Sequence, residues 1–201
     1  MVRWEEGVER DHDILTHQAD ALEAALAVDV TDEDRRVVLA WIVQTLWPAL
    51  ELHLRKEEEV FFPAVHRLIG ENAGAVTLMQ EEHKELRDAH RRLAELLQVY
   101  EHTNWNGIRL AAESLMERLE DHRKKERRLI LDVLEYSLKS KELKDLAGEF
   151  EEVARRAHEE EGWPATILYS KRTASPPGRG LNVPDEIGYG NVFHKITAER
   201  P

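Results

Sequence analysis

The chain has 201 residues, of which 42% are hydrophobic and 34% are charged, and its formal net charge is −12. This composition is sufficient for a folded core and argues against intrinsic disorder. The negative charge argues against nucleic acid as a partner, because a phosphate backbone is repelled without a strong basic patch. The chain has no cysteine, which excludes disulfides, thiolate metal sites and cysteine nucleophiles.

The N-terminal sequence gives an expectation about the compartment. The segment MVRWEEGVERD lacks the apolar region of a signal peptide. We find no apolar run that approaches the length of a membrane span. The absence of cysteine fits a reducing compartment. We therefore expect a cytoplasmic protein that binds neither membrane nor nucleic acid.

Apolar residues recur at spacings of three and four through most of the first 137 residues, which predicts long helices. The short connections VDVT, GENAG and HTN contain turn-forming residues. Short connections make consecutive helices antiparallel neighbours, so we predict an all-α fold, an up-down-up-down antiparallel four-helix bundle. Pro48 and Pro63 lie inside the second helix, and each favours a kink because it removes a backbone hydrogen bond. The four predicted helices span about residues 6–28, 32–69, 73–101 and 105–137.

The sequence after residue 137 divides into a further helix and an irregular tail. A shorter helix is predicted over about residues 140–160. From residue 163 onwards proline and glycine become frequent and no helical period remains. The predicted organisation is a four-helix bundle over residues 1–138, a C-terminal helix on or extending the bundle over 139–162, and a Pro/Gly-containing tail over 163–201.

Ionisable side chains interrupt the apolar face of every predicted bundle helix. Two helices carry a histidine and a glutamate four residues apart, so both side chains point the same way. The other two helices each carry one histidine on the apolar face. At roughly 1.5 Å per residue, all these groups lie at nearly the same depth in the bundle. The six residues are His12, His53, Glu57, His83, His122 and Glu126.

The two glutamates are the strongest indication of a metal site. Glutamate is almost never fully buried without a partner, and burying an unpaired carboxylate costs several kcal/mol. The same apolar faces carry no lysine or arginine that could supply positive charge. A polar core without metal, with hydrogen-bonded histidines, is the alternative. Helical bundles commonly build metal sites from such inward groups, so we predict that these six residues bind metal.

The ligand types indicate which metal is expected. Nitrogen and carboxylate ligands without sulfur suit iron or manganese, with zinc as an alternative. Two carboxylates from facing helices can bridge two ions, and four histidines can then complete the ligand set. Six protein ligands leave coordination positions on two octahedral ions. Oxygen, nitric oxide or peroxide could bind there.

The segment HLRKEEEVFFP at residues 53–63 resembles the second-helix signature of the hemerythrin-like family, whose members are also called HHE cation-binding domains. The Glu-His pair at 82–83, the histidine and glutamate at 122 and 126, and RDHD at 10–13 are similar to the remaining family motifs. The resemblance covers about residues 6–137. It implies a non-haem di-iron centre in which Glu57 and Glu126 are the bridging carboxylates.

Two positions depart from the oxygen-carrying hemerythrins. Those proteins have a second histidine one turn after the third-helix ligand, where this chain has Arg87. They also have an aspartate five residues after the fourth-helix histidine, whereas Glu126 follows His122 by four. The resemblance is therefore to the bacterial hemerythrin-like branch. That branch includes proteins linked to oxygen or redox sensing, iron handling, and nitric oxide or peroxide chemistry.

We therefore predict a metal-binding protein with two iron ions that binds, senses or processes oxygen, nitric oxide or peroxide. An enzymatic role in removing peroxide or nitric oxide is a less favoured alternative, because the sequence supplies no evident proton-relay base beyond the ligands. Another alternative is an iron-storage or interaction module whose metal only staples the bundle. His90 and His194 are left open as additional ligands, and the sequence names no protein partner.

Overall fold

The computed structural model describes residues 4–27, 32–70, 74–98 and 104–161. The described residues form helices and contain no strand, which confirms the all-α prediction. Two of the elements, η1 and η2, are short π-helical turns. In chain order the elements are α1 (Glu6–Ala27), α2 (Asp32–Lys56), η1 (Glu57–Phe61), α3 (Phe62–Ile69), α4 (Gly74–Gln98), α5 (Trp105–Glu126), η2 (Arg127–Leu131), α6 (Asp132–Ser137) and α7 (Ser140–Glu161).

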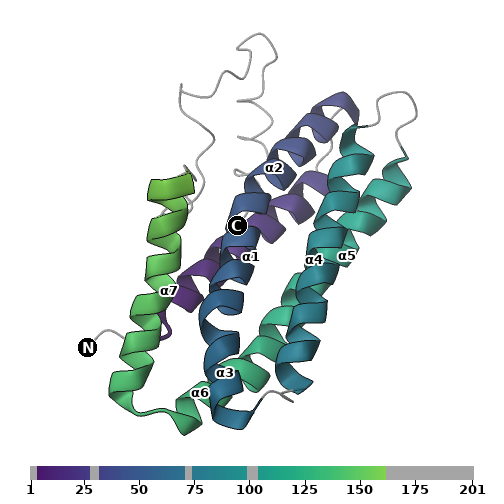
Figure 1. Cartoon of the computed structure of the whole chain (residues 1–201). Coiled ribbons are helices and arrows are strands. Elements are labelled where there is room, and N and C mark those ends of the chain that lie inside the picture. Colours follow the sequence, from purple (N-terminus) through teal and green to yellow (C-terminus); the bar gives the residue numbers. More distant parts are fainter. Residues whose placement is uncertain (1–3, 28–31, 71–73, 99–103, 162–201) are drawn as a thin grey trace, which may run out of the picture.

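Helices α1, α2, α4 and α5 form the body of the molecule. Contacts join α1 to α2, α2 to α4, α4 to α5, and α5 to α1, so the four helices enclose a common core. The elements α2, η1 and α3 follow one another without a break, as do α5, η2 and α6. Helix α7 packs on α2, η1 and α1, and Figure 1 shows it on the side of α2 away from α4 and α5.

Turn residues mark the described helix ends. Gly70 has a φ of 87°, a conformation that favours glycine, and its N–H donates to the carbonyl of His66 at the end of α3. At the start of α5, the side-chain oxygen of Asn104 accepts a hydrogen bond from the N–H of Gly107 at 2.9 Å. Two of the predicted connections, GENAG and HTN, are therefore found where α3 ends and where α5 begins.

The two π-helical turns lie next to the inward glutamates. The N–H of Phe62 donates to the carbonyl of Glu57, and the N–H of Asp132 donates to that of Arg127, five residues earlier in each case. The turn η1 begins at Glu57, and the turn η2 begins directly after Glu126. Pro63 comes just after the first turn, whereas Pro48 lies inside α2. Such π turns are frequent at functional sites.

The extra residue of η2 changes which side chains face the core. A strict helical period continued from His122 and Glu126 places Leu129 and Val133 on the buried face, but both are only partly buried. Ile130, Leu131 and Leu134 are buried instead. A π turn adds one residue and so rotates the following helix relative to an uninterrupted α-helix. A strict helical period does not include this rotation. In the second helix, the residues that share a helical face with His53 and Glu57 are all buried. They are Leu39, Ile42, Leu46, Leu50, His53, Glu57, Val60 and Ala64.

A polar layer separates two apolar clusters in the core. One cluster gathers residues near α3, α6 and α7, such as Phe61 and Phe150. The other gathers residues from the opposite halves of α1, α2, α4 and α5. Along α4, His83 lies between Met79 of the first cluster and Leu86 of the second. The inward ionisable side chains therefore form a layer with apolar side chains on both sides.

The helix from Asp34 to Ile69 is more apolar than expected from the sequence. It contains an 18-residue window of mean hydropathy 1.4, which by length and composition alone could cross a membrane. The expectation that no run approaches this length was therefore wrong. However, 56% of that window is buried inside the protein. A buried core helix needs an apolar surface for the same physical reason as a membrane span.

Helix α7 covers part of α2 through aromatic contacts. The ring of Phe150 stacks on that of Phe61 with centroids 4.8 Å apart. The Nζ of Lys56 lies 4.6 Å from the Phe150 ring centroid, within the range of a cation–π interaction. At the surface, Arg10 of α1 pairs with Glu151 of α7 at 2.6 Å. Phe150 therefore joins α7 both to the apolar core and to a buried lysine.

We expect Phe150→Ala to lower the free energy of unfolding by about 3–5 kcal/mol, because it removes a fully packed aromatic side chain. Urea denaturation of the metal-free protein measures this change. Tyr136→Ala is the matched aromatic control, since Tyr136 is 94% exposed and its loss is expected to change stability by less than about 0.5 kcal/mol. Equal effects of the two substitutions would contradict the described packing of α7.

Candidate metal centre

All six residues predicted as metal ligands come together in the polar layer. His53 lies at the end of α2 and Glu57 at the start of η1, whereas His122 and Glu126 both lie in α5. Helix α1 contributes His12, and α4 contributes His83. Five side chains are between 0% and 3% exposed, whereas His12 is 14% exposed. His12 is therefore the member of the layer that solvent reaches most readily.

Four of the residues form a first group of ligand atoms. The Nε2 of His12 is 2.7 Å from Oε2 of Glu126, and the Nε2 of His53 is 2.9 Å from Oε1 of Glu57. One nitrogen or oxygen from each residue lies within 4.8 Å of the others. Two imidazoles and two carboxylates at this spacing could hold one cation.

Glu57 also belongs to a second group, with His83 and His122. The Nε2 of His83 is 3.1 Å from Oε2 of Glu57, and the Nε2 of His122 is 3.8 Å from Oε1. The Glu57 carboxylate thus lies between the two groups, where it could contact two cations. Glu126, which the family resemblance also implied as a bridge, falls only in the first group.

Several atoms of the layer are close together without forming hydrogen bonds. In the described part of the chain, the buried Nε2 atoms of His12, His53 and His122 have no hydrogen-bond partner, nor do Oε1 of Glu57 and both carboxylate oxygens of Glu126. Buried polar atoms are normally satisfied, and leaving one unsatisfied costs about 1–3 kcal/mol. These nitrogens and oxygens converge without bonding one another, which fits a set of atoms that share cations.

Three of the histidines have a carboxylate beside their other ring nitrogen, and each carboxylate is paired with a cationic side chain. Metal-binding histidines are commonly oriented by such a carboxylate. The Nδ1–oxygen distances are 2.7 Å for His83–Glu58, 3.5 Å for His122–Glu82 and 3.6 Å for His53–Asp11. The first is a hydrogen bond, whereas the Nδ1 atoms of His122 and His53 have no hydrogen-bond partner among the described residues. The corresponding cationic partners are Arg87 for Glu58, Lys125 for Glu82 and Lys56 for Asp11.

The buried lysine contradicts one sequence inference. Lys56 is only 1% exposed, so the statement that the buried faces carry no lysine was wrong. Its Nζ lies 2.8 Å and 3.1 Å from the two carboxylate oxygens of Asp11. The lysine is buried because Phe150 of α7 covers it, and the sequence alone does not place α7 there. Its charge is paired with Asp11, not with either inward glutamate.

Arg87, at the position where an oxygen carrier has histidine, contacts acidic residues beside the layer. Its guanidinium donates to Glu51 at 2.8 Å and 3.0 Å and to Glu58 at 2.8 Å and 3.2 Å. Burial raises the pKa of Glu58, but the bonds from His83 and Arg87 outweigh it and lower the pKa to about 2. Glu58 therefore stays ionised and orients His83.

His90 does not join either group of ligand atoms. Its Nε2 is 2.8 Å from the carbonyl oxygen of Val43, and its ring lies 4.9 Å from that of Trp47. Burial lowers the pKa of His90, which favours the neutral ring in this core position. His194 lies outside the described residues.

Without metal, two histidines of the layer favour the protonated form. Burial lowers the pKa of His53, but the charge of Glu57 and its contact with Asp11 outweigh this and raise the pKa to about 10. In His122, burial is likewise outweighed by Glu57 and Glu82, and the pKa rises to about 9. Burial raises the pKa of Glu57, but His53 and the other histidines hold it well below its ordinary value. Protons then supply the positive charge that the carboxylates need.

The family model of the hemerythrin HHE cation binding domain matches residues 5–134. The chain belongs to the hemerythrin HHE cation-binding family. The match covers more than half of the 201 residues and includes the whole polar layer. No curated protein and no solved structure matches in the comparisons. The predicted family resemblance is confirmed, and α7 of this hemerythrin-like protein lies beyond the matched part.

We expect Lys56→Met to destabilise the metal-free protein by about 3–5 kcal/mol, because it leaves the Asp11 carboxylate buried without its cation. The double variant Lys56→Met/Asp11→Asn removes both charges and is expected to recover much of that loss. Urea unfolding of the wild type, both single variants and the double variant measures the coupling. Strictly additive effects would contradict a buried ion pair.

We expect the metal-free protein to lose stability as the pH rises from about 6.5 to about 10. The folded state holds protons on His53 and His122 that the unfolded chain releases near pH 6.5, so their stabilisation is complete below pH 6.5. This stabilisation is lost as the pH rises through the folded-state pKa values, about 9 for His122 and about 10 for His53. Urea unfolding across this range measures the loss. Metal affinity should rise with pH over the same interval, because binding displaces these protons.

Proposed function

We propose that this protein binds two metal ions, iron by preference, through His12, His53, Glu57, His83, His122 and Glu126. We further propose that the loaded centre binds, senses or processes a small ligand such as oxygen, nitric oxide or peroxide. The observation that carries this proposal is the set of buried nitrogen and carboxylate atoms that converge without hydrogen-bond partners. The family match independently supports cation binding.

The donor atoms favour iron or manganese, with zinc as an alternative, because all are imidazole nitrogens or carboxylate oxygens. A bound iron pair would supply redox and Lewis-acid chemistry. Glu57 is proposed to bridge the ions, since it belongs to both groups of atoms. Glu126 is proposed as the second bridge on the family resemblance.

The protein side chains around the layer would position the ligands and exclude water. Asp11, Glu58 and Glu82 each contact the Nδ1 side of a histidine, which directs its Nε2 towards the centre. The apolar clusters on both sides separate the layer from solvent. His12, the most exposed member, would face an arriving ligand.

The proposed architecture is the antiparallel up-down-up-down bundle of residues 1–138, with the segments 139–162 and 163–201 attached to it. Support comes from the closed set of contacts among α1, α2, α4 and α5 and from the short intervals between them. A cytoplasmic location is proposed on the absence of cysteine.

A metal that only staples the bundle is the alternative function. Such a site needs no access for other ligands, whereas a site that processes ligands does. Hollows on either side of His12 reach the layer between α1 and α5. Access at this point favours a centre that receives a small molecule over a closed structural metal.

Metal content after anaerobic loading with ferrous iron tests the proposal. We expect about two iron ions per chain in the wild type, and after air oxidation a near-ultraviolet charge-transfer absorption that changes on adding azide. Glu57→Ala should lose both ions, because Glu57 belongs to both groups. Glu126→Ala should weaken chiefly the ion of the first group.

Glu59→Ala is the matched control for Glu57→Ala. Glu59 stands two residues away and pairs with Arg55 and Arg156 at the surface, so its loss should leave the iron content unchanged. A wild-type protein that binds no iron, or one zinc ion with no spectral response to oxygen, would contradict the proposed function. Iron that ignores azide would favour the stapling alternative.

A further inference from the structure

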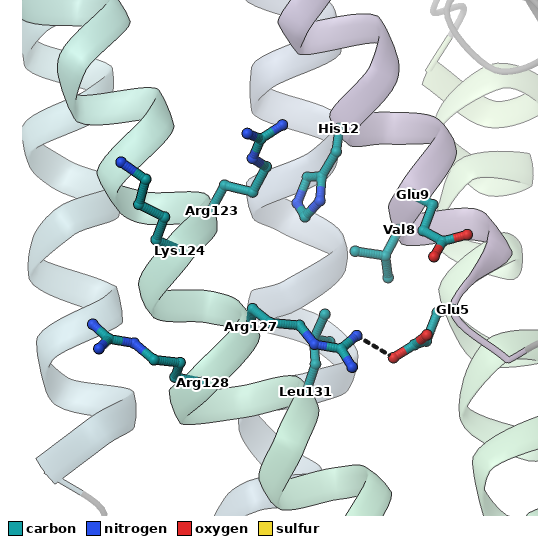
Figure 2. Close-up of a pocket in the computed structure, with 9 residues that line it drawn as sticks. All are labelled: Glu5, Val8, Glu9, His12, Arg123, Lys124, Arg127, Arg128 and Leu131. Atoms are coloured by element: carbon teal, nitrogen blue, oxygen red, sulfur yellow. Dashed lines mark hydrogen bonds and ion pairs between the residues drawn. The ribbon is translucent and has the colours of Figure 1, made fainter.

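Two hollows open between α1 and α5, one on each side of His12. The larger has a volume of about 610 Å³ and lies between the start of α1 and the end of α5 with η2. Figure 2 shows His12 facing it, with Arg123 and Arg127 on the opposite wall. The smaller, of about 420 Å³, lies farther along the same two helices. His12 and Arg123 line both hollows.

The smaller hollow reaches the polar layer directly. His53 and His122 line it together with His12. Both side chains are at least nine-tenths buried, and their Nε2 atoms have no hydrogen-bond partner among the described residues. Three candidate ligands are therefore accessible from this one space. The rest of its charged wall is mainly acidic, with Asp20, Glu23, Glu117 and Glu120 against the single Arg123. Glu120 is paired with Lys124 at 2.7 Å, so Glu23 and Glu117 contribute most to the charge of this wall.

The larger hollow has the opposite charge. Four basic residues line it, Arg123, Lys124, Arg127 and Arg128, together with the acidic Glu5 and Glu9. Arg127 reaches across to Glu5, as Figure 2 shows, and it also pairs with Asp132 at 3.1 Å and Glu135 at 3.4 Å. Lys124 pairs with Glu120 at 2.7 Å, so among the described residues Arg123 and Arg128 are the lining cations without an acidic partner. Arg123 and Arg128 therefore supply the local positive charge of this hollow, on a chain whose formal net charge is −12.

Arg123 lies where the two hollows meet. Its Nη1 is 3.2 Å from Oγ1 of Thr16, a neutral partner on α1, so the side chain spans the space between the two helices. It directly follows His122 in the sequence. Because arginine stays charged at every relevant pH, Arg123 contributes a fixed positive charge to both hollows.

We propose that the two hollows are separate entrances to the metal centre, the acidic one for metal cations and the basic one for small anionic ligands. Arg123 is the residue that separates ligands by charge. Clefts lined by one sign of charge concentrate ions of the opposite sign and raise their association rates. This inference rests on the proposed metal-binding function, but it assigns residues outside the ligand set.

The variant Arg123→Gln gives the sharpest test, because it changes the two association rates in opposite directions. At low salt, ferrous iron should load into the metal-free protein about threefold faster, since a repelling charge is gone. Sodium azide should associate with the loaded, oxidised protein about threefold more slowly. Stopped-flow absorbance measures both rates. Simple distortion of the site would slow both, and would therefore contradict the proposal.

Arg118→Gln is the matched control for this substitution. Arg118 lies on the same helix and pairs with Glu85 of α4, away from both hollows. It produces the same change in net charge, so it should leave both rates near the wild-type values. An effect of Arg118→Gln equal to that of Arg123→Gln would assign the change to overall charge and overturn the proposal.

A second variant tests the acidic entrance alone. Glu23→Gln/Glu117→Gln should slow iron loading severalfold and leave azide association unchanged, and the difference should disappear at high salt. The control Glu149→Gln/Glu160→Gln changes the same charge on α7, where neither residue lines a hollow. Each variant should still bind as much iron as the wild type at equilibrium.

The outcomes separate this inference from the proposed function. If the wild type binds iron and azide but Arg123→Gln leaves both rates unchanged, the two-entrance proposal is wrong and the metal centre stands. If Glu23→Gln/Glu117→Gln binds less iron at equilibrium with an unchanged loading rate, these residues hold metal instead of guiding it. If the wild type binds no iron at all, the proposed function itself fails.

Discussion

The carboxylates of Glu57 and Glu126 are fully buried between two apolar clusters, and the remainder of the layer is arranged around them. A charge in such a place costs several kcal/mol unless it is compensated. Protons on His53 and His122 compensate it in the metal-free protein, and metal ions could do so more completely. The stability of the fold and the affinity for metal would therefore be linked, because the same nitrogens that hold protons are the candidate metal ligands.

Charge is also balanced outside the layer, by three similar sets of contacts. In each set a histidine contacts a carboxylate, and that carboxylate pairs with a cationic side chain. The carboxylate directs one histidine nitrogen to the centre, and the cation keeps that carboxylate ionised. His12 is the candidate ligand for which the described residues show no such set, and it is also the most exposed. Three histidines with a neighbouring carboxylate and one accessible histidine are suited to a centre that admits a ligand. The three sets are His53–Asp11–Lys56, His83–Glu58–Arg87 and His122–Glu82–Lys125.

Helical periodicity was sufficient to find the helices and to bring the six inward residues to one layer, because residues four apart share a face at any point of an α-helix. It failed where the backbone leaves that period or where a distant element decides burial. The π turn after Glu126 moved the buried positions from Leu129 and Val133 to their neighbours. Lys56 is buried between Asp11 of α1 and Phe150 of α7, and no local pattern contains that information. The role of Arg87 depended on acidic residues from another helix.

The contribution of α7 follows from the charge of Asp11. Asp11 contacts the Nδ1 side of His53, so its own negative charge must be neutralised in a buried place. Lys56 provides the positive charge, and Phe150 of α7 covers the lysine with a ring that favours a cation on its face. The family match ends at residue 134, before α7 begins at Ser140. An element outside the matched domain therefore supports a candidate ligand of the centre, and a related domain without this helix would need another way to neutralise the same carboxylate.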